Sequence, residues 1–141
     1  MGVVHHSVYP LYFEEARTAL MRDLGIPYSE LESAGVLLPL LSLSTRFILP
    51  PRYEEVIVLE SRLTRLSRVR LRLDYRIYRQ PGDVLLAEGH TEHCCVNAAF
   101  RPCRFPEHVR AAFDSVLEAG EEAGGAPRQT REPGRPGRRR T

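Results

Sequence analysis

The sequence predicts an α+β domain in which one long helix precedes an antiparallel β-sheet. Three observations support this prediction. Apolar residues recur at helical spacing near the start of the chain, they then alternate with a period of two from about residue 39 to residue 97, and turn residues separate the alternating segments. With 141 residues, the chain is long enough for one hydrophobic core, so we expect a single folded domain.

A first helix is expected over Val8–Leu24, because its apolar residues fall within one arc of roughly 160° on a helical projection. Ser7 is the expected N-cap, Pro10 is tolerated in the first turn, and Gly25 ends the helix. A short second helix is expected at 28–33. The apolar arc consists of Val8, Tyr9, Tyr12, Phe13, Ala16, Ala19, Leu20 and Leu24.

Four long strands and a terminal helix are expected after these helices. The third strand has the clearest alternation, since Val69, Leu71, Leu73, Tyr75 and Ile77 point one way and charged residues point the other way. Such alternation is typical of antiparallel strands that bury one face. The expected strands are 39–49, 54–66, 68–78 and 84–97, with a turn at 80–83 and a helix over 106–119.

The last part of the chain has a different composition. Residues 120–141 hold six Arg and three Glu, which leaves 14 Arg against 15 acidic residues in the rest. The excess positive charge therefore lies in the tail, and the folded part offers no basic surface that would predict nucleic-acid binding. The tail has almost no apolar residues, so we predict a folded domain over 1–119 and disorder over 120–141.

The chain has neither a long apolar run nor the pattern of a secretory signal, so we expect a cytoplasmic protein without membrane insertion. Its three cysteines are an odd number and are expected to be reduced thiols. His90 and Cys94 would share one face of a strand while His93 and Cys95 share the other. Four ligands so placed cannot converge, so we predict no metal site.

The start of the chain carries a more specific signal. Gly2-Val3-Val4-His5-His6 is followed by Tyr9 and by Tyr12-Phe13-Glu14-Glu15-Ala16-Arg17, with weaker matches at 66–71 and 86–91. In these segments the chain resembles the 4-hydroxybenzoyl-CoA thioesterase family of hotdog-fold proteins, including the bacterial acyl-CoA thioesterases associated with the Tol–Pal system. The resemblance implies a curved antiparallel sheet wrapped around a central helix, a homodimer or homotetramer, and hydrolysis of acyl-CoA without a cofactor.

The resemblance also implies roles for individual residues. The backbone N–H of His6, near the start of the helix, would polarise the thioester carbonyl. A helix N-terminus suits this role, because its free N–H groups and positive dipole end stabilise the oxyanion of the tetrahedral intermediate. Residues implied to contact the substrate are Gly2, Val3, His5, Tyr9, Ser67 and Arg68.

One part of the family pattern is missing from the sequence. The aspartate that attacks the thioester or activates water would lie three residues before Gly2, and therefore before Met1, together with the first strand. We therefore expect impaired hydrolysis in the 141-residue chain, either because its start is misplaced, which we favour, or because the chain is truly truncated. The alternative is a non-catalytic hotdog subunit that binds acyl-CoA or acyl carrier protein.

Several side chains have two interpretations. His5 and His6 could supply a general base or simply line a groove. Glu14 and Glu15 could supply a carboxylate, or lie on a solvated face where Glu14 pairs with Arg17. The arginine stripe of the third strand could bind CoA phosphates or form the wet face of the sheet. That stripe consists of Arg68, Arg70, Arg72 and Arg76.

Overall fold

The computed structural model of the protein describes residues 8–50, 55–123 and 128–131. Its main sheet is antiparallel, has five strands in the order β2-β5-β4-β3-β7, and is accompanied by the short pair β1-β6. The elements are α1 (Tyr9–Asp23), α2 (Tyr28–Ser33), β1 (Val36–Leu37), β2 (Leu40–Phe47), β3 (Ile57–Leu66), β4 (Arg70–Arg79), β5 (Val84–Cys94), β6 (Val96–Asn97), α3 (Glu107–Ala123) and β7 (Arg128–Arg131).

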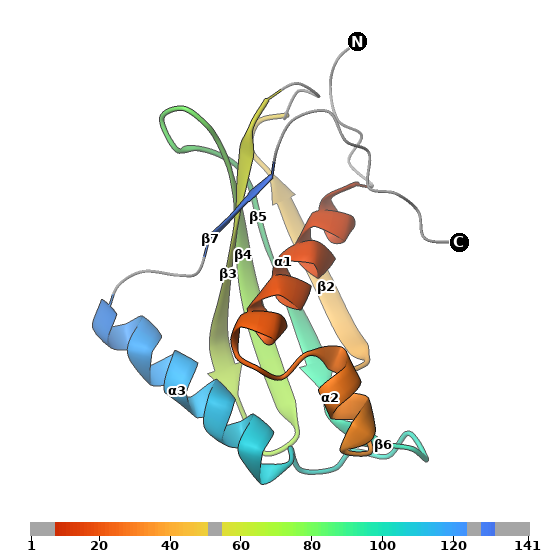
Figure 1. The fold of residues 1–141 in the computed structure, drawn as a ribbon. Coiled ribbons are helices and arrows are strands. Elements are labelled where there is room, and N and C mark those ends of the chain that lie inside the picture. Colours follow the sequence, from red (N-terminus) through yellow and green to blue (C-terminus); the bar gives the residue numbers. More distant parts are fainter. Residues whose placement is uncertain (1–7, 51–54, 124–127, 132–141) are drawn as a thin grey trace.

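Helix α1 lies across one face of the sheet, and α3 lies beside β3 near one end (Figure 1). The ring of Phe13 stacks on that of Tyr75, with centroids 4.6 Å apart. The helix comes especially close to the sheet at Gly89. A Cβ atom there would lie 2.3 Å from the carbonyl oxygen of Ser44 and 2.7 Å from the ring of Phe13. Gly89 is therefore required by the close approach of helix and sheet.

The predicted first helix is confirmed to within one residue at each end. Val8 occupies the N-cap position without a side-chain hydrogen bond, and Ser7, the predicted cap, lies outside the described residues. Pro10 stands in the first turn, where its missing N–H costs nothing. Met21 is buried in the same core although the predicted apolar arc omitted it.

The predicted alternation in the two central strands is also confirmed. In β3, Leu59, Ser61 and Leu63 are buried, and in β4 the buried side chains are Leu71, Leu73, Tyr75 and Ile77. Both strands contribute this face to the core beneath α1. The hydroxyl of Ser61 lies 3.4 Å from the backbone oxygen of Ala16 and donates to it, so even the polar member of the face has a partner.

Two parts of the tail that was expected to be disordered lie among the described residues. Helix α3 continues to Ala123, and β7 pairs antiparallel with residues 57–60 of β3. Glu and Ala favour helix, which explains the longer α3. An edge strand such as β3 presents unpaired N–H and C=O groups, and a following segment without proline can satisfy them. The division of the chain at residue 119 stays a prediction.

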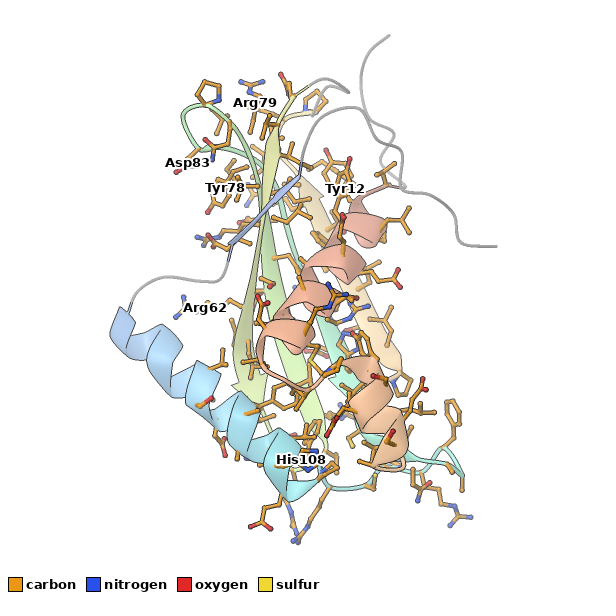
Figure 2. All side chains as sticks on the ribbon, in the orientation of Figure 1. Tyr12, Arg62, Tyr78, Arg79, Asp83 and His108 are labelled. Atoms are coloured by element: carbon orange, nitrogen blue, oxygen red, sulfur yellow. The ribbon has the colours of Figure 1, made fainter. Side chains whose placement is uncertain are left out.

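Helix α3 packs through Val109 and Phe113, and Phe113 meets Phe105 edge-to-face at 5.6 Å. Its first turn faces α2, where Nε2 of His108 lies 3.8 Å from a carboxylate oxygen of Glu30 (Figure 2). Within the described ranges, no helix is both long enough and apolar enough to cross a membrane.

Candidate active site

The start of α1 is the first part of the predicted site. Tyr9 is buried and packs edge-to-face against Phe47 at 4.8 Å and Tyr12 at 6.1 Å. Burial, together with the nearby Tyr12, raises the pKa of Tyr9 to about 12, so its phenol stays protonated at neutral pH. Tyr9 therefore joins α1 to the end of β2. The other predicted residues of this group, Gly2, Val3, His5 and His6, lie outside the described residues.

The hairpin between β3 and β4 holds the second part of the predicted site. The Ser67 hydroxyl accepts a hydrogen bond from the Arg70 N–H at 3.0 Å, and the Ser67 carbonyl accepts one from the Arg110 guanidinium at 2.8 Å. Ser67 is thus held by both the hairpin and α3. It lines a cavity of about 500 Å³ together with residues from both strands and from α3, among them Arg65, Arg70, Arg72 and Leu117.

Arg68 lies at a neighbouring cavity. This cavity has a volume of about 330 Å³ and is also lined by Arg104, Phe105, Glu107 and Arg110. Three guanidinium groups against one carboxylate give the cavity a positive character. Guanidinium groups bind phosphate and carboxylate through paired N–H donors, so this end of the molecule suits an anion.

The two parts of the predicted site lie far apart within one chain. Tyr9 contacts Phe47, which is paired with Ala87, whereas Leu71 beside the hairpin is paired with His93. Ala87 and His93 are six residues apart on β5, which corresponds to about 20 Å along the strand. Figure 1 shows the first turn of α1 and the β3–β4 hairpin at opposite ends of the sheet.

The predicted arginine stripe divides into two groups. Arg68 and Arg70 belong to the hairpin end, whereas Arg72 and Arg76 lie on the sheet face opposite α1. There Arg72 pairs with Asp74 at 3.1 Å, and Arg76 lies in register between Glu60 and Glu88. These charges line a shallow cavity of about 440 Å³ in which acidic and basic side chains alternate. This balance favours the interpretation of Arg72 and Arg76 as part of a solvated face.

A buried polar network lies beneath α1 and was missed by sequence reasoning. The Arg17 guanidinium donates to the Tyr28 hydroxyl at 2.6 Å and to the Tyr75 hydroxyl at 3.3 Å. Tyr75 is 2.7 Å from the Thr91 hydroxyl, which is 3.0 Å from Nε2 of His93. Arg17 therefore turns inward, and the interpretation in which it pairs with Glu14 on a solvated face is wrong, because its guanidinium binds the half-buried Tyr28 hydroxyl and the buried Tyr75 hydroxyl.

His93 ends this network in its neutral form. Its Nδ1 lies 3.2 Å from the carbonyl oxygen of Leu38 and donates to it. Nε2 is then the acceptor for Thr91, so the hydroxyls of Tyr75 and Thr91 and the ring N–H of His93 each have an acceptor. Burial, aided by the positive charge of Arg17, lowers the pKa of His93 to about 4. The network holds α1 on the sheet and contains no free base.

The remaining candidate groups are the carboxylates of α1 and the possible metal ligands. Glu14 and Glu15 are exposed on α1, and no carboxylate is buried among the residues that the structure describes. Over the same residues, no group of three His, Cys, Asp or Glu side chains is placed to hold a metal ion.

Residues 1–113 match the family described as the thioesterase-like superfamily. Among individual proteins, the chain is similar to the Bacillus subtilis (strain 168) protein named "Putative acyl-CoA thioesterase YneP". The two are 31% identical over 123 residues, which span 87% of this chain and 86% of that protein.

Solved structures show the same arrangement. The hypothetical protein TT1821 from Thermus thermophilus is 41% identical, with a TM-score of 0.76 over 82% of this chain and 88% of that one. A DHNA-CoA thioesterase from Staphylococcus aureus is 27% identical, with a TM-score of 0.79 over 87% of this chain and 85% of that one. These likenesses confirm the predicted α+β hotdog fold.

Proposed function

The chain belongs to the thioesterase-like superfamily, and on that premise we propose that it is a cytoplasmic hydrolase that splits an acyl-CoA into a free acid and CoA. The observation that carries the proposal is the match over residues 1–113, which includes the whole signature around His6. The names of the similar proteins, an acyl-CoA thioesterase and a DHNA-CoA thioesterase, support this reaction class. We also propose that, within this superfamily, the chain belongs with the 4-hydroxybenzoyl-CoA thioesterases, including those associated with the Tol–Pal system.

In the proposed mechanism, the thioester carbonyl lies against the backbone N–H of His6. Water adds to the thioester carbon, and that N–H stabilises the negative charge of the resulting tetrahedral intermediate. The C–S bond then breaks, and CoA leaves as a thiol with a proton from the water. Gly2, Val3, His5 and Tyr9 shape the groove around the acyl group. The buried, protonated phenol of Tyr9 supplies a packing surface between α1 and β2 and takes no proton from the substrate.

The working unit in this proposal is a homodimer formed through β2. This strand is at the edge of the sheet, and within the described ranges its outer side has no partner strand. It nevertheless exposes four large apolar side chains, those of Leu40, Leu41, Leu43 and Phe47. An open edge with this composition invites pairing with a second strand. A second copy of β2, related by a two-fold axis, would cover both the edge and these side chains.

A two-fold axis would also bring the two separated parts of the site together. Antiparallel pairing of two β2 strands places the Phe47 end of one protomer beside the Leu40 end of its partner. Leu40 is paired with His93, and His93 is paired with Leu71 next to the β3–β4 hairpin. The Leu40 end of β2 therefore lies at the same end of the sheet as this hairpin. The α1 start of one protomer would therefore share a substrate with Ser67 and Arg68 of the other.

The hairpin end suits the CoA portion of the substrate. CoA carries phosphate groups, and the cavity beside Arg68 offers three guanidinium groups from Arg68, Arg104 and Arg110. Arg110 also donates to the Ser67 carbonyl, which ties the two neighbouring cavities together. We therefore assign the phosphates to the Arg68 cavity and the pantetheine arm to the surface around Ser67.

The first experiment tests the backbone donor. Proline has no N–H, so His6→Pro removes the donor, whereas His6→Ala removes only the side chain. We expect His6→Pro to lower kcat by about 10²–10³-fold and His6→Ala to change it only slightly. Release of CoA thiol would be followed with aliphatic and aromatic acyl-CoA substrates and with acyl carrier protein, after circular dichroism has shown that both variants are folded. Equal losses in the two variants would contradict the backbone role.

The second experiment tests whether two protomers share one site. His6→Pro and Arg68→Ala homodimers are each expected to be weakly active. A one-to-one mixture that exchanges subunits should regain about one quarter of the wild-type activity, because half of the dimers then contain one intact site. A mixture that stays inactive after subunit exchange would mean that His6 and Arg68 act together within one chain and not across the dimer.

The third experiment tests the interface itself. Leu43→Arg should shift the protein from dimer to monomer in sedimentation equilibrium, because it places a charge in the apolar contact. Phe100→Arg is the matched control, since Phe100 is also strongly exposed but lies outside β2. A dimer that survives Leu43→Arg unchanged would contradict the proposed interface.

A second function, binding without turnover, is favoured by the absence of a buried carboxylate in the described part of the chain. Calorimetric titration with a non-hydrolysable acyl-CoA, together with an assay of CoA thiol release, separates the two functions. Tight binding with no turnover would support the non-catalytic subunit, and turnover would support the enzyme.

A further inference from the structure

Two cysteines meet where the chain leaves β5 and approaches α3. The Sγ atoms of Cys95 and Cys103 are 3.8 Å apart. The backbone N–H of Cys103 donates to the carbonyl oxygen of Cys95 at 2.9 Å, and Val96 forms an antiparallel bridge with Pro102. The two cysteines therefore occupy directly opposite positions in a short antiparallel segment.

These positions suit a covalent bond between the two sulfur atoms. Opposite residues that share a hydrogen bond in an antiparallel pair have Cα atoms about 5.5 Å apart. Disulfides span Cα separations of about 4.4–6.8 Å. The backbone thus needs no large movement, and rotation of the two side chains can close the remaining distance between the sulfur atoms.

We propose that Cys95 and Cys103 form a reversible dithiol–disulfide pair that is oxidised by a peroxide and reduced by a small thiol. Both cysteines are free thiols in the structure. This assignment is independent of the proposed hydrolase activity, because neither sulfur is among the residues assigned to acyl-CoA. Nor does it depend on a metal or on the terminal segments of the chain.

The two thiols have different roles in the oxidation. Cys103 is only half-buried, whereas Cys95 is fully buried. Burial, and the neighbouring Cys103, raise the pKa of Cys95 to about 12, so Cys95 stays protonated near neutral pH. Since the thiolate is the reactive form and needs access to the oxidant, Cys103 is the first to react.

The reaction proceeds in two balanced steps. The Cys103 thiolate attacks one oxygen of hydrogen peroxide, the O–O bond breaks, and hydroxide leaves and takes up a proton as water. This step leaves a sulfenic acid on Cys103. The Cys95 sulfur then attacks the Cys103 sulfur and loses its proton, the S–O bond breaks, and a second water leaves. The two thiols are oxidised to a disulfide while peroxide is reduced to two water molecules.

The disulfide would hold in place the segment that leads into α3. The loop between the two cysteines turns at Asn97, whose side-chain oxygen accepts from the N–H groups of Ala99 and Arg101. The residues directly after Cys103 are Arg104 and Phe105, which line the cavity beside Arg68. Oxidation would thus fix one wall of that cavity to the end of the sheet.

Cys94 supplies an internal control. It is also buried, but its sulfur lies 3.5 Å from the carbonyl oxygen of Cys95 and takes no part in the contact between the other two sulfur atoms. Cys94→Ser should therefore leave the pair intact. Cys103→Ser replaces the more exposed member and should prevent the bond without opening a large cavity in the core.

The test is a count of free thiols in denaturant after treatment of the folded protein with hydrogen peroxide. Wild-type protein should fall from three thiols to one, Cys94→Ser from two to none, and Cys103→Ser should keep both. Peptide mass mapping should find residues 95 and 103 linked within one chain, with the loss of two hydrogen atoms. Dithiothreitol should restore every thiol.

Three results would overturn the proposal. They are retention of all three thiols in the wild type, a bond that involves Cys94, and a bond between molecules. The wild-type mapping alone distinguishes them, so the test holds even where a variant folds poorly. A reductant-reversible rise in Tm on oxidation is expected as well, because the bond restricts the unfolded chain.

Discussion

Strands β4 and β2 belong to the same sheet and contain similar apolar residues, yet they bury them very differently. In β4 every second side chain from Leu71 to Ile77 is buried, and Leu73 is 1% exposed. In β2, Leu43 is 43% exposed and Phe47 is 53% exposed. The difference follows from position, because β4 has a paired strand on both sides and α1 across one face, whereas β2 is an edge.

This contrast shows that an apolar strand can either lie in the core or form an exposed edge of the sheet. The period of two in β4 describes a core that one protomer completes by itself. The apolar residues of β2 follow no such period of burial, and the protomer leaves them exposed. Apolar content alone therefore predicts that a strand is part of a sheet, but not whether its side chains face the core or a partner.

The largest expected effect distinguishes the two strands directly. Leu73→Ala should lower the free energy of unfolding by about 2–5 kcal/mol, because it leaves a cavity in a closed core. Leu43→Ala removes the same atoms from an exposed site and should cost the monomer about 1 kcal/mol or less. Urea unfolding at two protein concentrations would measure both. Equal losses in dilute protein would mean that β2 is as enclosed as β4.

The next effect concerns the close approach of Gly89 to Ser44 on β2 and to Phe13 on α1. Gly89→Ala should destabilise the protein by about 1–3 kcal/mol, because the new Cβ would collide with the Ser44 carbonyl and the Phe13 ring. Ser44→Ala alters the same neighbourhood without adding atoms and serves as the control. Thermal unfolding of both variants would measure the difference. A Gly89→Ala variant as stable as wild type would show that α1 has room to move away from the sheet.

A third effect is a loss of stability at low pH that arises from the buried His93. The folded-state pKa of His93 is about 4, below its ordinary value of 6.5. The unfolded chain therefore binds a proton before the folded chain does, so stability is complete above pH 6.5 and falls as the pH drops from 6.5 toward 4. The loss at pH 5 should be about 2 kcal/mol relative to pH 7.

Urea unfolding across this pH range would measure the loss attributed to His93. The same series on His93→Gln provides the reference, because glutamine can hydrogen-bond without titrating. An equal slope in wild type and His93→Gln would assign the pH dependence to other groups.

The smallest effect is expected on the solvated face. A carboxylate oxygen of Glu88 lies 3.5 Å from a guanidinium nitrogen of Arg46, whose side chain is 78% exposed. Glu88→Gln should change the free energy of unfolding by less than about 1 kcal/mol, and the change should shrink further in high salt. Chemical unfolding at low and high ionic strength would test this. A large, salt-independent loss would mean that this face is covered by a partner.

Much of the fold follows from local patterns in the sequence. The burial of β3 and β4 follows their alternation, and the limits of α1 follow its apolar arc and Gly25. The inward turn of Arg17 could not be predicted in this way. On a helical projection it stands outside the apolar arc, and only the positions of Tyr28 and Tyr75 make it a half-buried donor. The only sequence feature that singled out Arg17 was its position in the segment that resembles the thioesterase family.

The sequence by itself determined the order of helices and strands, the inner face of the sheet and the likeness to thioesterases. These depend on backbone periods and on short segments of neighbouring residues. Only the tertiary structure decided that β2 stays exposed, that the two parts of the predicted site lie at opposite ends of one protomer, and that Cys95 meets Cys103. Such relations join residues distant in the chain, and they depend on how sheet and helices pack, which no local pattern specifies.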